Sequence, residues 1–169
     1  MTDQSMNIPA ALAAMVDDIR ALMAEKNIET PLIVGIHTGG VWIANALRER
    51  LGISESLGEL NINFYRDDFT RNGLHPQIQP SKLPLSIEDR HILLVDDVLF
   101  TGRTVRAAMN EIFDYGRPAS ITLAVLFERE GRELPVFAEV SGIKQTLGKK
   151  QYIDISGPEP LELTIRNKA

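Results

Sequence analysis

The stretch from residue 91 to residue 109 constrains the fold more than any other part of the chain. An apolar run at residues 92–95 leads into two adjacent carboxylates, Asp96 and Asp97, and then into a short loop that ends in Thr101-Gly102-Arg103-Thr104. The apolar run is too short for a buried helix and is typical of a buried parallel strand. A helix is predicted after the loop, and the free N–H groups at its start would favour a bound phosphate. We therefore expect a phosphate site at the loop, beside carboxylates that could accept hydrogen bonds from sugar hydroxyls.

A second strand–loop–helix unit occurs earlier in the chain. A buried strand at residues 31–36 runs into His37-Thr38-Gly39-Gly40, and a helix is predicted at residues 41–50. Paired glycines can expose several backbone N–H groups to an anion, but they also suit a tight turn without a ligand. The loop after Asp97 is neither a Walker loop nor a Gly-x-Gly-x-x-Gly motif, so a solvated turn is an alternative there as well.

The remaining segments predict an α/β fold in a single domain that spans residues 1–169. The predicted order is helix 8–26, strand 31–36, helix 41–50, strand 57–65, a long loop, strand 92–95, helix 103–114 and strand 120–127. Such alternation favours a mostly parallel sheet with helices on both faces, and ligands bind at the carboxyl ends of its strands. The loops after residues 36 and 95, and the residues after 127, should therefore meet at one edge.

Two segments are expected to cover that edge. Residues 66–84 contain several prolines and no clear periodicity, which predicts a flexible loop that closes over a ligand, although a β-hairpin fits the same composition. Residues 128–152 mix basic and acidic side chains around a short strand predicted at 136–140, and strands predicted at 152–155 and 161–165 follow. We interpret residues 128–152 as a small hood over the site.

Charge and composition exclude some classes of function. The chain has no Cys, which excludes thiol catalysis and a Cys-bound metal. The net charge of −5 argues against a general nucleic-acid binder, which carries a basic face. The longest apolar run, at residues 121–127, is too short to span a membrane, and the start of the chain lacks the pattern of a secretory signal. We expect a cytoplasmic protein without a membrane partner.

The string Val95-Asp96-Asp97-Val98-Leu99-Phe100-Thr101-Gly102-Arg103-Thr104 closely resembles the signature for phosphoribosyl diphosphate (PRPP) in type I phosphoribosyltransferases. Three further strings resemble the PyrR family of pyrimidine operon regulators and uracil phosphoribosyltransferases: Phe64-Tyr65-Arg66-Asp67-Asp68, Asp114-Tyr115-Gly116-Arg117-Pro118 and Arg132-Glu133-Leu134-Pro135. The resemblance covers nearly the whole chain. It implies a type I phosphoribosyltransferase fold with a small hood, a homodimer or larger homo-oligomer, and Mg²⁺-dependent transfer from PRPP to uracil that yields UMP. It also implies control by the uridine nucleotides UMP and UTP.

The resemblance also implies a role for each matching residue. Asp96 and Asp97 would hold the ribose hydroxyls of PRPP, and Arg129 would lie near the uracil and the diphosphate; these three are the predicted catalytic residues. Ile153 would line the base pocket, and Arg66 would belong to the flexible arm. The other predicted nucleotide-binding residues are Thr38, Gly39 and Gly40 for the diphosphate, and Val98, Leu99, Phe100, Thr101, Gly102, Arg103 and Thr104 for PRPP, the last four around its 5′-phosphate. No residue is predicted as a metal ligand, because Mg²⁺ would bind mainly through PRPP.

The chain departs from the family pattern in its charges. Gram-positive members carry Lys-Thr-Arg-Gly where this chain has His37-Thr38-Gly39-Gly40, so two cations are missing and slow catalysis is expected. They also carry Asp-Arg-Gly-His-Arg where this chain has Glu128-Arg129-Glu130-Gly131-Arg132. Arg20 is the only basic residue at positions 8–25, which together with the net charge weakens the case for a bound RNA leader. Two alternatives to the enzyme remain: a uridine-nucleotide-sensing RNA-binding regulator with weak or no catalysis, and a nucleotide sensor that has lost both activities.

Overall fold

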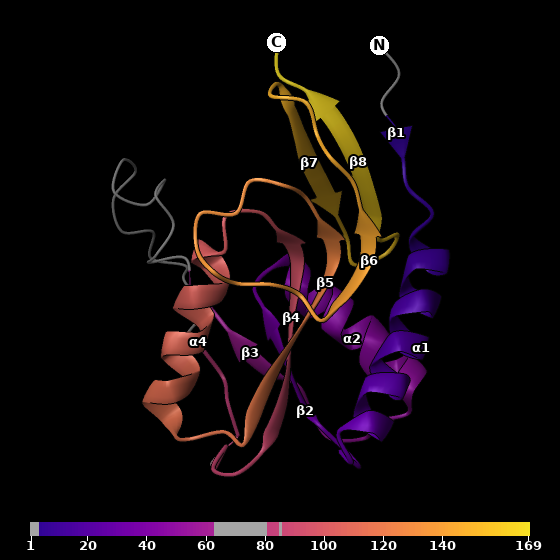
Figure 1. Ribbon diagram of the computed structural model, residues 1–169. Coiled ribbons are helices and arrows are strands. Elements are labelled where there is room, and N and C mark those ends of the chain that lie inside the picture. Colours follow the sequence, from indigo (N-terminus) through magenta and orange to yellow (C-terminus); the bar gives the residue numbers. More distant parts are fainter. Residues whose placement is uncertain (1–3, 63–80, 85) are drawn as a thin grey trace.

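A five-stranded parallel sheet forms the centre of the computed structural model, which describes residues 4–62, 81–84 and 86–169 (Figure 1). Its strands, in spatial order, are β3 (Gly58–Leu60), β2 (Leu32–Ile36), β4 (His91–Leu99), β5 (Ser120–Glu128) and β6 (Val140–Lys144). Every neighbouring pair is parallel. The predicted α/β fold with a mostly parallel sheet is confirmed, and the carboxyl ends of these strands lie at one edge.

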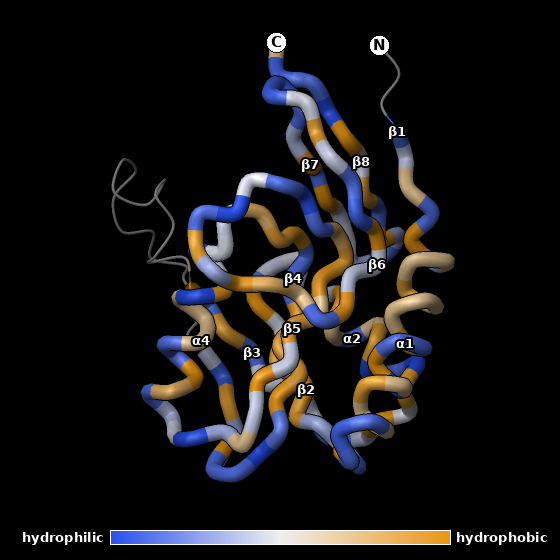
Figure 2. Tube along the Cα trace, in the orientation of Figure 1, coloured by the Kyte–Doolittle hydropathy of each residue, from blue (hydrophilic) through white to orange (hydrophobic). Residues whose placement is uncertain are grey.

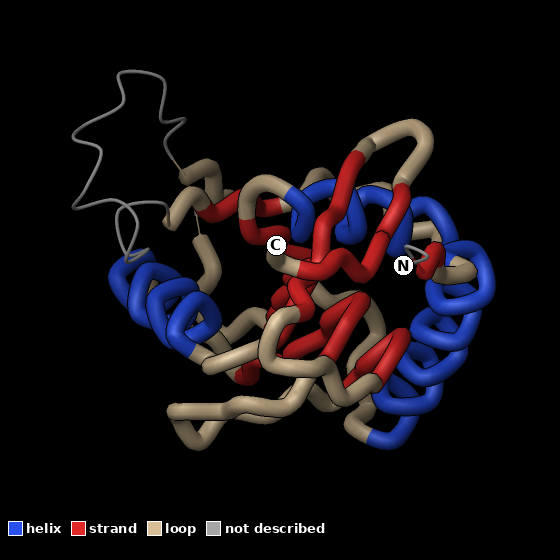
Figure 3. The backbone as a smooth tube through the Cα atoms, turned by 90° about the horizontal axis from the view of Figure 1, so that it is seen from above, coloured by secondary structure: helices blue, strands red, loops and turns tan. Residues whose placement is uncertain are grey.

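Helices cover both faces of the sheet, as expected. α1 (Ile8–Glu25) and α2 (Gly39–Leu51) pack on one face and α4 (Arg103–Tyr115) packs on the other, an arrangement seen from above in Figure 3. Successive residues of β4 alternate between two cores, because Leu93 and Val95 face α1 and α2 whereas Leu94 faces α4. Burial on both faces explains the continuous apolar runs, which form the hydrophobic centre of Figure 2. None of the described helices is long and apolar enough to cross a membrane.

β4 is longer than the apolar run from which it is predicted. Its pairing with β5 continues beyond residue 95, so that Asp96 lies opposite Val125 and Val98 lies opposite Phe127. The prediction that the two carboxylates follow the strand is therefore wrong, since both lie within it, near its carboxyl end. The hydrogen bonds between β4 and β5 are made by backbone groups. The two strands can therefore stay paired at residues with polar side chains, near the edge of the sheet.

A second, antiparallel sheet stands beyond the carboxyl ends of the central strands (Figure 1). It contains β7 (Gln151–Ser156), β8 (Glu162–Asn167) and the short β1 (Gln4–Ser5), in the order β1-β8-β7. Leu163 and Ile165 of β8 are at most 3% exposed and belong to the same core as α1 and α2. This sheet covers the edge as a hood would, but it overlaps the predicted range 128–152 only at residues 151 and 152.

Two predicted strands differ from the structure. The strand predicted at 136–140 is wrong, because residues 136–139 form no strand and β6 begins only at residue 140, where it pairs with β5. Val136 and Ala138 instead pack against the core beside α4 while Phe137 is exposed, so the alternating pattern arises from packing without strand pairing. Of the strand predicted at 57–65, only β3 forms within the described residues. The loop predicted at 66–84, including Arg66, lies outside the described residues except for 81–84.

Candidate functional site

The carboxyl ends of β2, β4 and β5 bring the three predicted site segments together. β2 leads into the start of α2, β4 leads into the turn before α4, and β5 leads into Arg129. Contacts join these segments: Gly39 lies against Asp97, and the guanidinium carbon of Arg129 is 4.1 Å from the centroid of the Phe100 ring. The expected meeting of the three segments at one edge is confirmed, and this edge is where ligands bind in open parallel sheets.

Asp96 and Asp97 are held by the backbone of the strand in which they lie. Asp96 is 2% exposed, and its Oδ1 accepts a hydrogen bond from the Asp97 N–H at 2.9 Å. Asp97 is half-buried, and its Oδ1 accepts a hydrogen bond from the Val98 N–H at 2.7 Å. These bonds fix one oxygen of each carboxylate, so the pair has a defined orientation and is not a solvated turn.

The start of α2 packs closely on β4 at both of its glycines. A Cβ atom on Gly39 would lie 2.3 Å from Oδ2 of Asp97, and one on Gly40 would lie 2.6 Å from the carbonyl oxygen of Val95. Thr38, the residue before the helix, is exposed and makes no side-chain capping bond. The two glycines therefore have a packing role of their own, and they place the positive end of the α2 dipole at the edge of the sheet.

The turn between β4 and α4 also depends on a glycine. Gly102 has a φ of +93°, a left-handed conformation that L side chains rarely adopt, and it is the N-cap of α4. The hydroxyl oxygen of Thr101 accepts a hydrogen bond from the Arg103 N–H at 3.2 Å. The Arg103 side chain is engaged by Glu133, to which its Nε donates at 2.8 Å. A phosphate at this turn could be bound by the N–H groups of the helix start.

A cleft of about 480 Å³ lies between the edge of the central sheet and the second sheet. Its lining comprises Asp96, Asp97, Val98, Phe100 and Thr104 from β4 and α4, Arg129 after β5, and Lys149, Gln151, Tyr152, Ile153, Ile155 and Lys168 from β7 and the residues around it. The amino groups of Lys149 and Lys168 have no hydrogen-bond or ion-pair partner within the part of the chain that the structure describes. The cleft has room for a small-molecule ligand, with carboxylates contributed by β4 and cations contributed by the other segments.

Arg129 links the two sheets across this cleft. Its guanidinium lies over the Phe100 ring in a cation–π contact, and its Nη1 is 3.5 Å from the carbonyl oxygen of Gln151. Its Nε is buried and has no hydrogen-bond partner among the residues described. Since a buried N–H without a partner is unfavourable, Arg129 is a group whose hydrogen bonding a ligand would complete.

The cleft gathers many of the predicted site residues, but not all of them. Leu99 is 1% exposed and packs in the core beside α4, and Thr38, Gly39, Gly40, Thr101, Gly102 and Arg103 do not line the cleft. Nε2 of His37 lies 3.3 Å from Oε2 of Glu59, and Arg66 lies outside the described residues. The prediction missed Lys149, Gln151, Tyr152, Ile155 and Lys168. Alternate residues of a strand share a face, so choosing Ile153 could have pointed to its neighbours two positions away, Gln151 and Ile155.

Comparison with known proteins defines the class first. The family model for the phosphoribosyl transferase domain matches residues 7–157. Similar solved structures include a hypoxanthine-guanine-xanthine phosphoribosyltransferase (19% identity, TM-score 0.62, 87% of this chain and 79% of that chain) and the purine phosphoribosyltransferase of Pyrococcus horikoshii (22%, 0.61, 83% and 85%). At these identities the likeness shows the fold alone, which is that of the type I phosphoribosyltransferases.

Curated relatives identify the family within this class. The bifunctional protein PyrR of Nitrosococcus oceani is 56% identical over 164 residues, which cover 96% of this chain and 93% of that protein. The protein of the same name from Pseudomonas aeruginosa is 55% identical over 152 residues (90% and 89%), and that from Pseudomonas fluorescens is 50% identical over 166 residues (98% and 99%). The chain therefore belongs to the PyrR family of the type I phosphoribosyltransferases.

Proposed function

We propose that this protein is a uracil phosphoribosyltransferase, which converts uracil and PRPP into UMP and diphosphate. The observation that carries the proposal is one cleft that contains the Asp96-Asp97 pair, Thr104 at the start of α4, and Arg129. A sugar phosphate needs acceptors for its hydroxyls and an anion site beside them, and this edge offers both. The PyrR relatives support the choice of a pyrimidine base.

The reaction needs positioning more than a protein nucleophile. Displacement of diphosphate from the anomeric carbon passes through an oxocarbenium-like state, so the protein must align uracil N1 and exclude water. In this proposal the ribose hydroxyls donate to Asp96 and Asp97, whose orientation is fixed by the N–H groups of Asp97 and Val98. The 5′-phosphate accepts from the N–H groups at the start of α4 and from Thr104. Neither carboxylate has to transfer a proton.

The diphosphate and the base occupy opposite sides of this arrangement in the proposal. The diphosphate lies at residues 38–40, where the start of α2 has no acidic residue in its first turn and its dipole supplies partial positive charge. Arg66 would approach from the predicted flexible arm. Uracil lies under the second sheet, near Ile153 and Arg129. The product UMP and the related UTP would bind at the same cleft and so control the protein, which we expect to act in the cytoplasm as a homodimer or larger assembly.

The residues at this edge fit Mg²⁺ that is held mainly by PRPP. Mg²⁺ prefers oxygen ligands, retains several waters, and is usually bound through one or two carboxylates together with substrate phosphates. Asp96 and Asp97 offer carboxylate oxygens, and no group of three His, Asp or Glu side chains that could hold a metal occurs among the described residues. When bound, Mg²⁺ would neutralise charge on the departing diphosphate.

Calorimetry and a steady-state assay test this proposal. The protein with Mg²⁺ is titrated with PRPP and then with UMP, and the titrations are repeated with Asp97→Asn. Removing the charge from a group that accepts hydrogen bonds costs about 1.5–3 kcal/mol, so the variant should bind PRPP about ten- to hundredfold more weakly. Absence of UMP formation that depends on uracil, PRPP and Mg²⁺ in the wild-type protein would overturn the proposal.

A second candidate function is regulation through RNA, and the name of the relatives, bifunctional protein PyrR, favours it. In this proposal the cleft binds a uridine nucleotide and another surface binds the leader transcript of a pyrimidine operon. The net charge of −5 opposes it, because RNA affinity depends on neutralising phosphates. A gel shift with the leader transcript of the organism's own pyrimidine operon, with and without UMP, separates the two functions. Nucleotide-dependent binding would support the second function, and its absence would leave only the enzyme.

A further inference from the structure

The segment that follows β5 is bound to the turn that follows β4. We call residues 129–134 the strap. The Arg129 N–H donates to the carbonyl oxygen of Leu99 at 3.1 Å, and the N–H groups of Glu133 and Leu134 both donate to the carbonyl oxygen of Thr101, at 2.9 and 3.1 Å. The strap is therefore hydrogen-bonded to the backbone of residues 99–101, just before the start of α4. The proposed 5′-phosphate site depends on the position of this helix start.

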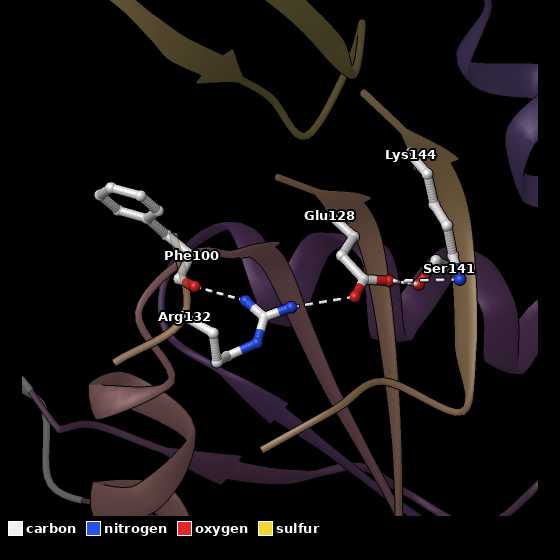
Figure 4. Close-up of polar contacts among 5 residues, drawn as sticks. All are labelled: Phe100, Glu128, Arg132, Ser141 and Lys144. Atoms are coloured by element: carbon white, nitrogen blue, oxygen red, sulfur yellow. Dashed lines mark hydrogen bonds and ion pairs between the residues drawn. The ribbon is translucent and has the colours of Figure 1, made fainter. Parts of the chain in front are cut away.

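One side chain of the strap reinforces this attachment. The Arg132 guanidinium donates through Nη1 to the carbonyl oxygen of Phe100 and through Nη2 to Oε1 of Glu128 at 2.9 Å (Figure 4). The side chains of Arg132 and Glu128 are 25% and 18% exposed, so solvent screens this pair less than a surface pair. A planar guanidinium can reach two acceptors at once, which a single ammonium group cannot do in the same geometry.

Glu128 is itself held from the other side. Its Oε2 accepts a hydrogen bond from the Ser141 hydroxyl at 2.5 Å and lies 3.6 Å from Nζ of Lys144, and both of these residues are on β6 (Figure 4). The contacts form a continuous path from β6 through Glu128 and Arg132 to the Phe100 carbonyl. The turn after β4 is thus braced against the far strand of the sheet.

The position of Phe100 in turn sets the position of Arg129. The Phe100 ring is the surface over which the Arg129 guanidinium lies. The strap also contacts the ring from one side, because a Cβ atom on Gly131 would lie 2.4 Å from Cε2 of Phe100, and Gly131 has a φ of +121°. A shift of the Phe100 backbone would therefore move both the start of α4 and the cation in the cleft.

We propose that Arg132 is a positioning residue of the phosphoribosyl transfer site. By joining the Phe100 carbonyl to Glu128, it fixes the 5′-phosphate turn and Arg129 together, without touching the substrate itself. The inference rests on the proposed function, since it names the residue that keeps that site in its active geometry. Sites of this kind are sensitive to displacements of about 1 Å, which a missing brace would permit.

Arg132→Lys tests the inference, with Arg90→Lys as a matched control. Arg90 also donates two hydrogen bonds to a carboxylate, that of Glu55, at 3.1 and 2.7 Å, and its side chain is 33% exposed. Arg90 is therefore a guanidinium with comparable hydrogen bonding and exposure, and it does not line the cleft. Both substitutions keep the charge and lose the planar fork, but only Arg132→Lys loses the brace on Phe100.

Three measurements on the full-length variants decide the outcome. We expect Arg132→Lys to raise the Kd for PRPP about tenfold and to lower kcat about tenfold, while Arg90→Lys changes both by less than about twofold. Amide hydrogen exchange at residues 99–106 should become about tenfold faster in Arg132→Lys only. A PRPP affinity and kcat like those of the control would overturn the inference. If the wild-type protein does not bind PRPP, the proposed function fails, and unchanged exchange at residues 99–106 would then overturn the brace independently.

Discussion

Alanine at each of the two glycines that open α2 should produce different defects, because the added methyl groups meet different atoms. At Gly39 the new Cβ would lie 2.3 Å from Oδ2 of Asp97, the end of a side chain that can rotate away. At Gly40 it would lie 2.6 Å from the carbonyl oxygen of Val95, which is backbone in the middle of the sheet and cannot move alone. We therefore predict that Gly39→Ala impairs ligand binding and that Gly40→Ala impairs folding.

The sizes of the two effects follow from the contacts. In Gly39→Ala, the displaced Asp97 loses its hydrogen bond from the Val98 N–H, at a cost of about 1.5–3 kcal/mol, while alanine is favoured over glycine in a helix by about 1 kcal/mol. The net loss is about 1 kcal/mol, or about 2–4 °C in Tm for a chain of this size. Gly40→Ala has no rotamer that relieves its contact, so overpacking of about 3 kcal/mol and a fall of about 6–12 °C are expected.

Calorimetric titration with PRPP and thermal unfolding measure the two defects separately. Gly39→Ala should weaken PRPP binding about ten- to hundredfold, as expected for the loss of one charge-assisted hydrogen bond to the ribose. Gly52→Ala is the control for stability, because Gly52 has a φ of +70° and, apart from its neighbours in the chain, no atom of the described residues lies within 4 Å of the point that a Cβ would occupy. Alanine there therefore costs about 1–2 kcal/mol without disturbing the cleft. Wild-type affinity in Gly39→Ala would refute the role of Asp97, and a larger fall in Tm for Gly39→Ala than for Gly40→Ala would refute the packing argument.

Two further predictions concern the second sheet. The double substitution Lys149→Ala with Lys168→Ala removes two cations that have no partner among the described residues, and it should weaken UMP binding about three- to tenfold at low salt, with a smaller difference near about 0.5 M NaCl; titrations that show an equal loss at both salt concentrations would contradict this. In Gly157→Ala, the new Cβ would lie 2.8 Å from Cε3 of Trp42, so the turn between β7 and β8 should be displaced at a cost of about 1–3 kcal/mol. Trp42 is the single tryptophan of the chain, and a fluorescence spectrum without a red shift would show that this contact is not disturbed.

The sequence predicts the three central strands, β2, β4 and β5, well because each of them is buried on both faces over most of its length. Such strands are continuous apolar runs, and the helices between them show their own period, so their order along the chain determines a parallel sheet. The meeting of Asp97, Gly39 and Arg129 at one edge follows from that order alone. The extent of β4 does not follow from the order, because Asp96 and Asp97 interrupt its apolar run. Backbone pairing with β5 keeps these two residues in the strand, and a hydrophobicity pattern does not detect such pairing.

The second sheet is harder to predict because its contacts connect distant parts of the chain. β1 is two residues long and pairs Gln4 with Ile165, so neither its length nor its composition marks it as a strand. The cations Lys149 and Lys168 reach the cleft only because β7 and β8 lie next to each other, and exposed lysines are ordinary surface residues when judged from sequence. The contacts of the strap are equally hard to predict from the sequence, because Arg132 donates to the carbonyl oxygen of Phe100, which is distant along the chain.

The charged residues of the cleft bear on the slow catalysis that is expected from the two missing cations at residues 37–40. In the Gram-positive pattern the loop before α2 carries two fixed cations, whereas here the corresponding positions hold His37 and Gly39. Positive charge in the described part of the cleft comes instead from Arg129, Lys149 and Lys168, on other segments of the chain. A cation need not lie on the diphosphate loop to lower the energy of a polyanion, because fields add over several ångströms inside a cleft with few mobile ions. Under the proposed function the cleft keeps these three cations, so the loss of the loop cations does not by itself argue for a protein without catalytic activity.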